Sequence, residues 1–229
     1  MPAYNEEQLI EGVVRNWLDE LSRLGIDFEM RVYDDGSRDR TGDILDRMVA
    51  GEPRLVVTRQ TNRGHGATIL RGYTEAASEW IFQVDGDGEI PPAGLEPLWQ
   101  KREAYDFLLG YRQGRTDVVD RRLVSGVSRL AVRVLYGPGV GDVNSPCRLM
   151  RRTAIAPLLP LVAGTFAPNV ILSGLAVRAK LRIYQAPVQF TPRRAGTVSI
   201  AGWKLWKVAA RSFKETVAVS FRRLNGPRA

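Results

Sequence analysis

The sequence has one cysteine and no long apolar run, and each shortage excludes a class of protein. Cys147 alone cannot form an internal disulfide, so a disulfide-stapled secreted scaffold is excluded. No basic and then apolar segment opens the chain, so we expect a reducing, cytoplasmic setting. A membrane-spanning helix needs roughly 18 apolar residues. The longest candidate, 154–163, is broken by Pro157 and Pro160, so we expect no spanning helix.

What is present is enough for a globular domain. The 229 residues are 44% hydrophobic, which suffices for the core of one domain with at most an appendage. The net charge of +8 comes from residues 193–229, which hold nine of the 33 Lys and Arg but one of the 25 acids. The other 24 basic and 24 acidic residues balance, so an anionic partner is expected at the C-terminal end.

Short strands and helices alternate along the first half of the chain. The pattern predicts strands at 28–33, 55–57, 80–84 and 106–109, with helices that follow Asn5 and Gly66 and helices near 41–49 and 94–103. It then predicts a long helix near 119–136, shorter ones near 152–159 and 168–178, and a strand pair around 181–191. Alternation at this spacing indicates an α/β fold with a mostly parallel sheet and helices on both faces.

An acidic loop follows the strand 80–84. Asp85, Asp87 and Glu89 are separated by glycines, at the carboxyl end of a strand where open α/β sheets bind ligands. Crowded carboxylates repel one another unless a cation neutralises them, so the loop is a candidate Mg²⁺ or Mn²⁺ site. Alone, the same residues also fit an ordinary turn.

Four motifs occur in the order that glycosyltransferases of family two have: Pro2-x-Tyr4-Asn5-Glu6, Asp34-Asp35-Gly36-Ser37-x-Asp39-x-Thr41, Asn62-x-Gly64-x-Gly66 and Asp85-x-Asp87. The chain resembles their dolichyl-phosphate mannose synthase and bacterial polyprenyl-phosphate glycosyltransferase branch. The resemblance implies the Rossmann-like GT-A fold. It continues through Gly110-x-Arg112, Arg121-x-x-x-Ser125, Asp142-x-Asn144 and Arg193-x-x-Gly196.

The resemblance also implies roles for single residues. The nucleotide-sugar would be bound by Pro2, Tyr4, Glu6, Asp35, Asn62, Gly64, Asp85 and Gly86. Asp87 and Glu89 would ligate the metal, although the synthases often have Gln at the position of Glu89. His65 lies where relatives often have Lys, and a direct contact with the donor is one of its two interpretations.

The acceptor side calls for cations more than for a base. A lipid phosphate is already an anion and can attack the anomeric carbon directly, so arginine forks that hold phosphates are what the reaction needs. The catalytic candidates are Asp87, Arg112, Arg121, Ser125 and Arg193. Asp142 and Asn144 fit either an acceptor loop or a brace for that loop.

The segment 200–229 is predicted to be a basic amphipathic helix, appended to a single domain at 1–199. Within that domain, 1–117 would be the nucleotide-sugar half and 118–199 the acceptor half. Trp203, Trp206, Ala210, Phe213 and Val217 form an aromatic stripe beside basic residues. Such a helix can lie on an anionic membrane surface, or it can pack its stripe on the body of the protein.

The first strand of the GT-A fold is expected to be missing, because Met1 directly precedes Pro2. We expected the true start to lie upstream, and restoring upstream residues to raise the melting temperature.

Together these patterns predict a metal-dependent inverting enzyme. It would move a hexose from a GDP- or UDP-sugar to a polyprenyl phosphate at the cytoplasmic face of the membrane. The alternatives are transfer to a glycan hydroxyl and an inactive membrane-associated scaffold that binds nucleotide-sugar. Nucleic acid is not an expected partner, because the basic residues lie in one amphipathic tail.

Overall fold

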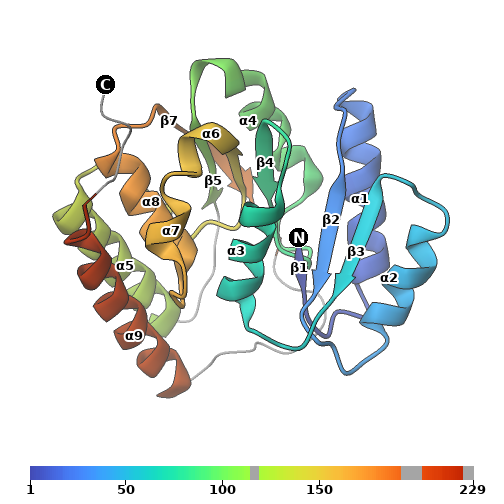
Figure 1. Ribbon diagram of the computed structural model, residues 1–229, viewed down its shortest axis with the longest axis horizontal. Helices are drawn as coiled ribbons and strands as arrows, with labels where there is room; N and C mark the ends of the chain where they lie inside the picture. Colours follow the sequence, from blue (N-terminus) through green and yellow to red (C-terminus); the bar gives the residue numbers. More distant parts are fainter. Residues whose placement is uncertain (114–118, 192–202, 224–229) are drawn as a thin grey trace.

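The computed structural model describes residues 1–113, 119–191 and 203–223, and their strands form two sheets (Figure 1). The first sheet is parallel, in the order β1 (Pro2–Ala3), β2 (Met30–Asp34) and β3 (Leu55–Arg59). The second has the order β4 (Trp80–Gln83), β6 (Arg148–Arg151), β5 (Phe107–Gln113) and β7 (Ile183–Gln189). In it β6 runs antiparallel to both neighbours, while β5 and β7 are parallel.

Helices cover both sheets, as the α/β pattern predicts. The first sheet is accompanied by α1 (Ile10–Arg23) and α2 (Thr41–Val49), and α3 (His65–Glu75) contacts β1 and β2. Beside the second sheet lie the short helices η1 (Pro92–Gly94), α4 (Glu96–Lys101), η2 (Arg102–Ala104), α6 (Arg152–Ile155) and α7 (Leu159–Val162). The helices α5 (Val119–Tyr136), α8 (Pro168–Arg178) and α9 (Trp203–Ser220) form a layer on the left in Figure 1.

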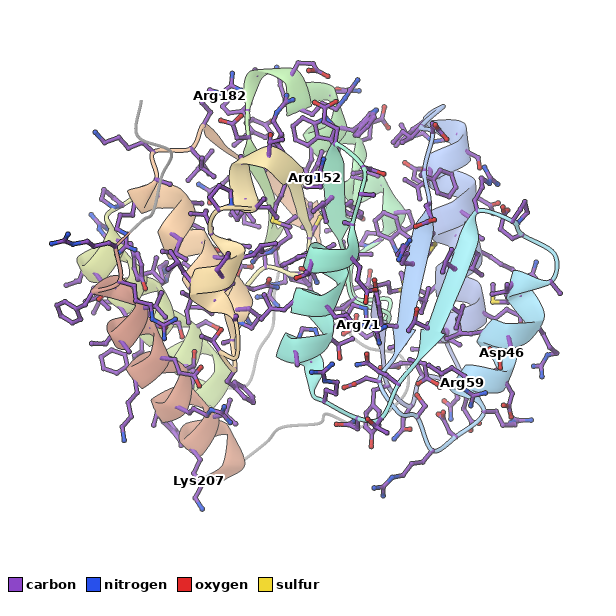
Figure 2. All side chains as sticks on the ribbon, viewed as in Figure 1. Asp46, Arg59, Arg71, Arg152, Arg182 and Lys207 are labelled. Atoms are coloured by element: carbon purple, nitrogen blue, oxygen red, sulfur yellow. The ribbon has the colours of Figure 1, made fainter. Side chains whose placement is uncertain are left out.

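The apolar residues explain which faces are covered. Helix α1 buries Ile10, Val14, Trp17 and Leu18, whose spacing makes one stripe. Three consecutive residues of β5, Phe107 to Leu109, are fully buried, as in a strand covered on both faces. Helix α8 is buried from Pro168 to Ala176 and therefore lacks a polar face. On the surface, Arg59 of β3 binds Asp46 of α2 at 2.9 Å (Figure 2).

Three sequence-based expectations differ from the structure. The stretch 181–191 contributes the single strand β7, which pairs with β5, rather than a strand pair. Strand β6 was not predicted, because Arg148 and Arg151 at its ends hide the apolar Leu149 and Met150 between them. The helix expected near 94–103 is divided into η1, α4 and η2.

The first strand, which we expected to be missing, is represented by two residues, since Pro2 and Ala3 pair with Tyr33 and Asp34 of β2. The expectation that upstream residues would complete this strand stays a prediction. The amide of Tyr33 also donates to Met1 O at 2.9 Å. A cavity of about 310 Å³ lies beside this short strand and is lined by Trp17, Phe82 and other apolar side chains. The amide of Gly86 donates to Pro2 O, so β1 is bonded to the loop that follows β4.

The proposed boundary at residue 117 falls outside the described residues, so the division into two halves stays a prediction. None of the helices in the described ranges is long and apolar enough to cross a membrane.

Replacing Gly174 of α8 by alanine should destabilise the fold. A Cβ there would lie 2.7 Å from the ring of Tyr136, whose hydroxyl is fixed by a 2.7 Å bond to Thr216 O. Overpacking of this kind costs about 1–3 kcal/mol. In α1, Gly12 has open space around its Cβ position, so Gly12→Ala is the matched control and should stabilise by about 0.5–1 kcal/mol. Urea unfolding measures both; equal stability of Gly174→Ala and wild type would contradict the packing.

Candidate functional site

One large cleft opens at the carboxyl ends of β1, β2, β4 and β5. It has a volume of about 2140 Å³. Twelve of the predicted site residues line it: Pro2, Tyr4, Glu6, Asp35, Asn62, Gly64, Asp85, Gly86, Asp87, Glu89, Arg112 and Ser125. Their motifs are spread over more than 120 positions of the chain, so folding alone brings them together.

The acidic loop lines one side of the cleft. The amide of Glu89 donates to Asp87 Oδ1 at 3.1 Å, which turns the loop, and Asp85 Oδ1 accepts a 2.9 Å bond from Gln83 Nε2. Burial, and then the charges of Asp85 and Glu89, raise the pKa of Asp87 to about 7. The neighbouring groups therefore do not stabilise a full negative charge on Asp87.

The acidic loop fits a divalent cation. Asp87 and Glu89 offer the hard oxygen ligands that Mg²⁺ and Mn²⁺ prefer. Within the described ranges, no group of three or more His, Cys, Asp or Glu side chains is arranged to hold a metal by itself. The residues present thus fit an ion that takes its remaining ligands from phosphate oxygens and water, as Mg²⁺ commonly does.

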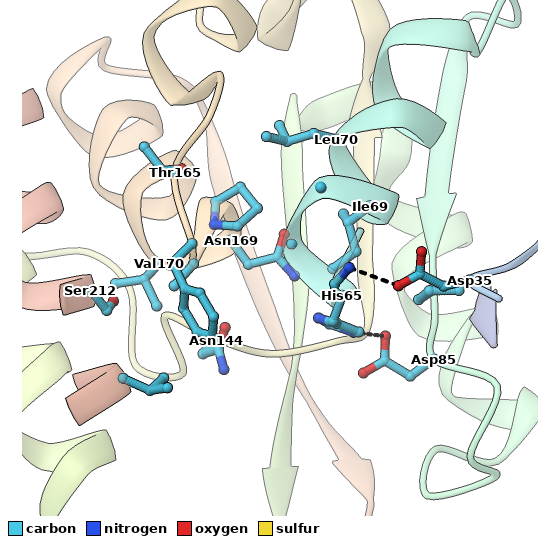
Figure 3. A pocket seen from close by; sticks show the side chains of 18 of the residues that line it. Asp35, His65, Ile69, Leu70, Asp85, Asn144, Thr165, Asn169, Val170 and Ser212 are labelled. Atoms are coloured by element: carbon cyan, nitrogen blue, oxygen red, sulfur yellow. Dashed lines mark hydrogen bonds and ion pairs between the residues drawn. The ribbon is translucent and has the colours of Figure 1, made fainter. Parts of the chain in front are cut away.

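His65 closes the loop from the opposite side. It is the first residue of α3, and its Nε2 lies 3.0 Å from Asp85 Oδ1 (Figure 3). The ring thus contacts the acidic loop at the amino end of a helix, where backbone N–H groups favour anions.

Asp35 is engaged by the glycine-rich turn. Its Oδ1 accepts bonds from Gln60 Nε2 at 2.7 Å and the Arg63 amide at 2.8 Å, and its Oδ2 accepts one from the Gly64 amide at 2.9 Å. The carboxylate, which is buried, therefore fixes the turn that leads into α3. Its predicted role beside the base and ribose stays a prediction.

An ion pair organises the part of the cleft beside the end of β5. Arg112, near the end of β5, binds both oxygens of Asp142, with Nε to Oδ2 at 2.8 Å and Nη2 to Oδ1 at 3.1 Å. The Arg112 side chain is only 9% exposed, so this pair is held firmly at the cleft wall. Ser125 is exposed on α5 and lines the same cleft. The side chain of Arg121 and the whole of Arg193 lie outside the described part of the chain.

Sequence reasoning missed the wall opposite the acidic loop. It is formed by the loop between α7 and α8, the start of α8 and one face of α9, where Thr165, Asn169 and Ser212 line the cleft (Figure 3). Phe166 O is so close to α3 that a Cβ on Gly66 would lie 2.3 Å from it. Gly66, the last glycine of the Asn-x-Gly-x-Gly motif, was a sequence signal for a close backbone approach. The segment around Phe166, 100 residues later, has no sequence pattern that identifies it as the partner.

Comparison with known proteins assigns the family. The family model for glycosyl transferase family 2 matches residues 1–159, and the chain belongs to this family. The resemblance found in the sequence is therefore confirmed.

Curated relatives share part of their length with this chain. An undecaprenyl-phosphate 4-deoxy-4-formamido-L-arabinose transferase of Pseudomonas fluorescens is 31% identical over 179 residues, which cover 73% of this chain and 53% of the relative. The enzyme of the same name from Pectobacterium atrosepticum is 26% identical over 183 residues, covering 75% of this chain and 56% of the relative. The chain thus spans about half the length of these relatives.

Solved structures agree on the fold. Glucosyl-3-phosphoglycerate synthase of Mycobacterium tuberculosis, crystallised with Mn²⁺, UDP-glucose and phosphoglyceric acid, superposes with a TM-score of 0.67 at 19% identity. The match covers 94% of this chain and 77% of that one. The GT-A fold predicted from the motifs is confirmed.

Replacing Asp87 by asparagine should stabilise the metal-free protein at pH 8. Because folding raises the pKa of Asp87 to about 7, the folded state holds a proton that the unfolded state releases near pH 4. The stability from this proton is present below about pH 4 and is lost as the pH rises to about 7. The melting temperature of Asp87→Asn should therefore exceed that of wild type at pH 8, and the difference should shrink towards pH 4.

The control is Glu103→Gln, which changes a carboxylate with a side chain 72% exposed. It should shift the melting temperature little at any pH. An Asp87→Asn protein that melts no higher than wild type at pH 8 would show that the loop is not crowded.

Proposed function

We propose that this protein is a metal-dependent glycosyltransferase that moves a hexose from a nucleoside-diphosphate sugar to a polyprenyl phosphate. The observation that carries the proposal is the single cleft in which the acidic loop of Asp85, Asp87 and Glu89 and the Arg112–Asp142 pair both lie. The first group suits a metal-bound diphosphate, and the second suits an anionic acceptor.

On the donor side, the residues would bind and orient the diphosphate. Asp87 and Glu89 would hold Mg²⁺ or Mn²⁺, which when bound supplies charge stabilisation to the departing diphosphate. The N-terminal segment and the turn braced by Asp35 would enclose the nucleotide. His65 would keep Asp85 in place through their 3.0 Å contact.

On the acceptor side, the charge pattern favours a phosphate over a hydroxyl. A hydroxyl acceptor needs a base, and Asp142 has both carboxylate oxygens bonded to Arg112. A phosphate needs no base, but it needs cations and hydroxyls to orient it, which Arg112 and Ser125 would supply. Arg121 and Arg193 complete the proposed set of phosphate-binding residues.

The relatives support these substrate classes. Enzymes named as undecaprenyl-phosphate sugar transferases support a polyprenyl-phosphate acceptor. The synthase crystallised with Mn²⁺ and UDP-glucose shares the fold, which accommodates a metal ion together with a nucleoside-diphosphate sugar.

With Mn²⁺ and a panel of UDP- and GDP-sugars, the protein should transfer labelled sugar to polyprenyl phosphate. The product is measured as label in an organic extract. Chelation of the metal and Asp87→Asn should each reduce the rate at least about a hundredfold, because both remove charge stabilisation of the leaving group. Transfer to a glycan but to no lipid, with any donor, would overturn the proposed acceptor.

We also propose that the protein works attached to the cytoplasmic face of the membrane through α9, with help from α5. Helix α9 buries a mostly polar face, Ser212, Thr216 and Val219, and leaves Trp206 and Phe213 42% and 47% exposed. Of the predicted stripe, Trp206, Ala210 and Phe213 are therefore exposed and Val217 is half-buried, and the exposed Lys207 points outward beside them (Figure 2).

The neighbouring helix α5 repeats this arrangement. Val127, Leu130 and Val134 are 53%, 61% and 74% exposed on one face, with the exposed Arg129 and Arg133 among them. Apolar side chains mixed with cations suit the headgroup region of an anionic membrane.

Phe213→Glu should weaken binding to vesicles that contain anionic lipid by about tenfold. The change replaces an apolar side chain that enters the membrane interface by a carboxylate, which anionic headgroups repel. Val134→Glu tests α5 in the same way. Val49→Glu is the control, since Val49 is an exposed apolar residue of α2, on the other side of the molecule (Figure 1). Vesicle flotation measures binding; equal losses in all three variants, or none, would contradict the proposal.

A further inference from the structure

Arg148 is a buried cation without an acidic partner. It begins β6 and has no exposed surface. Among the ion pairs of the described residues, none includes Arg148. Its guanidinium instead binds backbone carbonyls: Nε and Nη2 donate to Ser145 O at 3.0 and 2.8 Å, Nη2 to Val143 O at 3.4 Å, and Nη1 to Asn169 O at 3.3 Å. Burying an unpaired charge is costly, so a purely structural residue would more readily be apolar here.

The first segment that Arg148 holds is the turn on the acceptor side. Val143 and Ser145 flank Asn144, and the turn begins at Asp142, which binds Arg112 in the cleft. The Ser173 hydroxyl of α8 lies 2.8 Å from both Val143 O and Asn169 O, so it can donate its proton to either of these carbonyls. Arg148 thus holds the turn that begins at Asp142.

The second segment is the start of α8, and it leads to the donor side. Asn169 Nδ2 donates to Gln83 Oε1 at 3.1 Å, and Gln83 Nε2 donates to Asp85 Oδ1 at 2.9 Å. The Tyr73 hydroxyl lies 2.8 Å from Asn169 Oδ1 and 3.1 Å from Gln83 Oε1, so it can donate its proton to either amide oxygen. A buried chain of hydrogen bonds therefore joins Arg148 to the acidic loop, with Asn169 placed between the two walls (Figure 3).

We propose that Arg148 is a positioning residue that holds the turn on the acceptor side of the cleft through the carbonyls of Val143 and Ser145. Its bond to Asn169 O ties this turn to the start of α8, whereas the donor side is held mainly by the side chains of Asn169 and Gln83. A planar guanidinium with five N–H donors can bind carbonyls from two segments at once, which the single ammonium of lysine does not reproduce. The names of the two sides rest on the proposed function.

The two sides should respond differently to substitution. The acceptor-side turn loses most of its support when Arg148 is changed, whereas Asp85 keeps its contact with His65. Arg148→Lys should therefore raise KM for a short prenyl phosphate about tenfold and change KM for the donor less than about threefold. Asn169→Ala breaks the bond to Gln83 but leaves its own backbone carbonyl, so it should raise the donor KM and spare the acceptor.

Two further variants keep the test sharp. Ser173→Ala, a milder change, should shift the acceptor KM in the same direction as Arg148→Lys even if the latter folds poorly. Arg151→Lys lies on the same strand, three residues away, and should leave both KM values unchanged. A role limited to stability would lower the melting temperature and move both KM values together in Arg148→Lys and Asn169→Ala, which would overturn the proposal.

Hydrogen exchange tests the inference without any substrate. The amides at 143–147 should exchange about tenfold faster in Arg148→Lys than in wild type and at the wild-type rate in Arg151→Lys. If the wild-type protein transfers no sugar, the proposed function fails, while this measurement still decides whether Arg148 holds the turn. Unchanged exchange in Arg148→Lys would overturn the inference in either case.

Discussion

The crowding of Asp85, Asp87 and Glu89 in one turn is the constraint on which the rest of the cleft depends. Burial, and then the like charges of Asp85 and Glu89, raise the pKa of Asp87 to about 7. Gln83, His65 and the amide of Glu89 relieve part of the repulsion. The protein therefore stores an unfavourable electrostatic arrangement that a cation can resolve, and such arrangements cluster at functional sites.

The surrounding fold holds this arrangement in place. The loop is bonded to β1 through Gly86 and to α3 through His65, so strand, loop and helix are fixed relative to one another. Asp35 likewise fixes the glycine-rich turn, because its carboxylate accepts three N–H hydrogen bonds. A site built this way needs little rearrangement to receive a ligand, which is the benefit of preorganisation.

Much of the donor side could be predicted from the sequence, because its residues sit in short motifs at the ends of strands. The alternation of strands and helices gave the fold class, and Asp85, Asp87 and Arg112 lie in the predicted cleft. Strand β6 could not be predicted, since its pattern is too short and too charged to signal a strand. Asn169 and Ser212 reach the cleft only through tertiary packing, which leaves no local pattern. The length of β1 was also misjudged, because two paired residues suffice to form it.

The periodic pattern of α9 predicted an amphipathic helix correctly, but it did not show whether the aromatic stripe packs on the body of the protein or faces away from it. The stripe of Trp206 and Phe213 was visible in the sequence, but either burial or exposure fitted it. The structure resolves the choice through polar contacts on the other face: Thr216 O accepts from Tyr136, and Ser220 O accepts from Arg178. Hydrogen bonds to backbone carbonyls, together with the burial of Val219, thus hold this face of the helix against the body.

The attachment of α9 has a consequence for modularity. Glu215 accepts the Phe166 amide at 2.6 Å, the Arg211 guanidinium lies 5.4 Å from the Phe166 ring centre, and Phe166 O abuts Gly66, the neighbour of His65. Helix α9 therefore contacts the start of α3 through the loop that holds Phe166. A chimera in which another amphipathic segment replaced α9 would also change one wall of the cleft, so α9 and the cleft have to be engineered together.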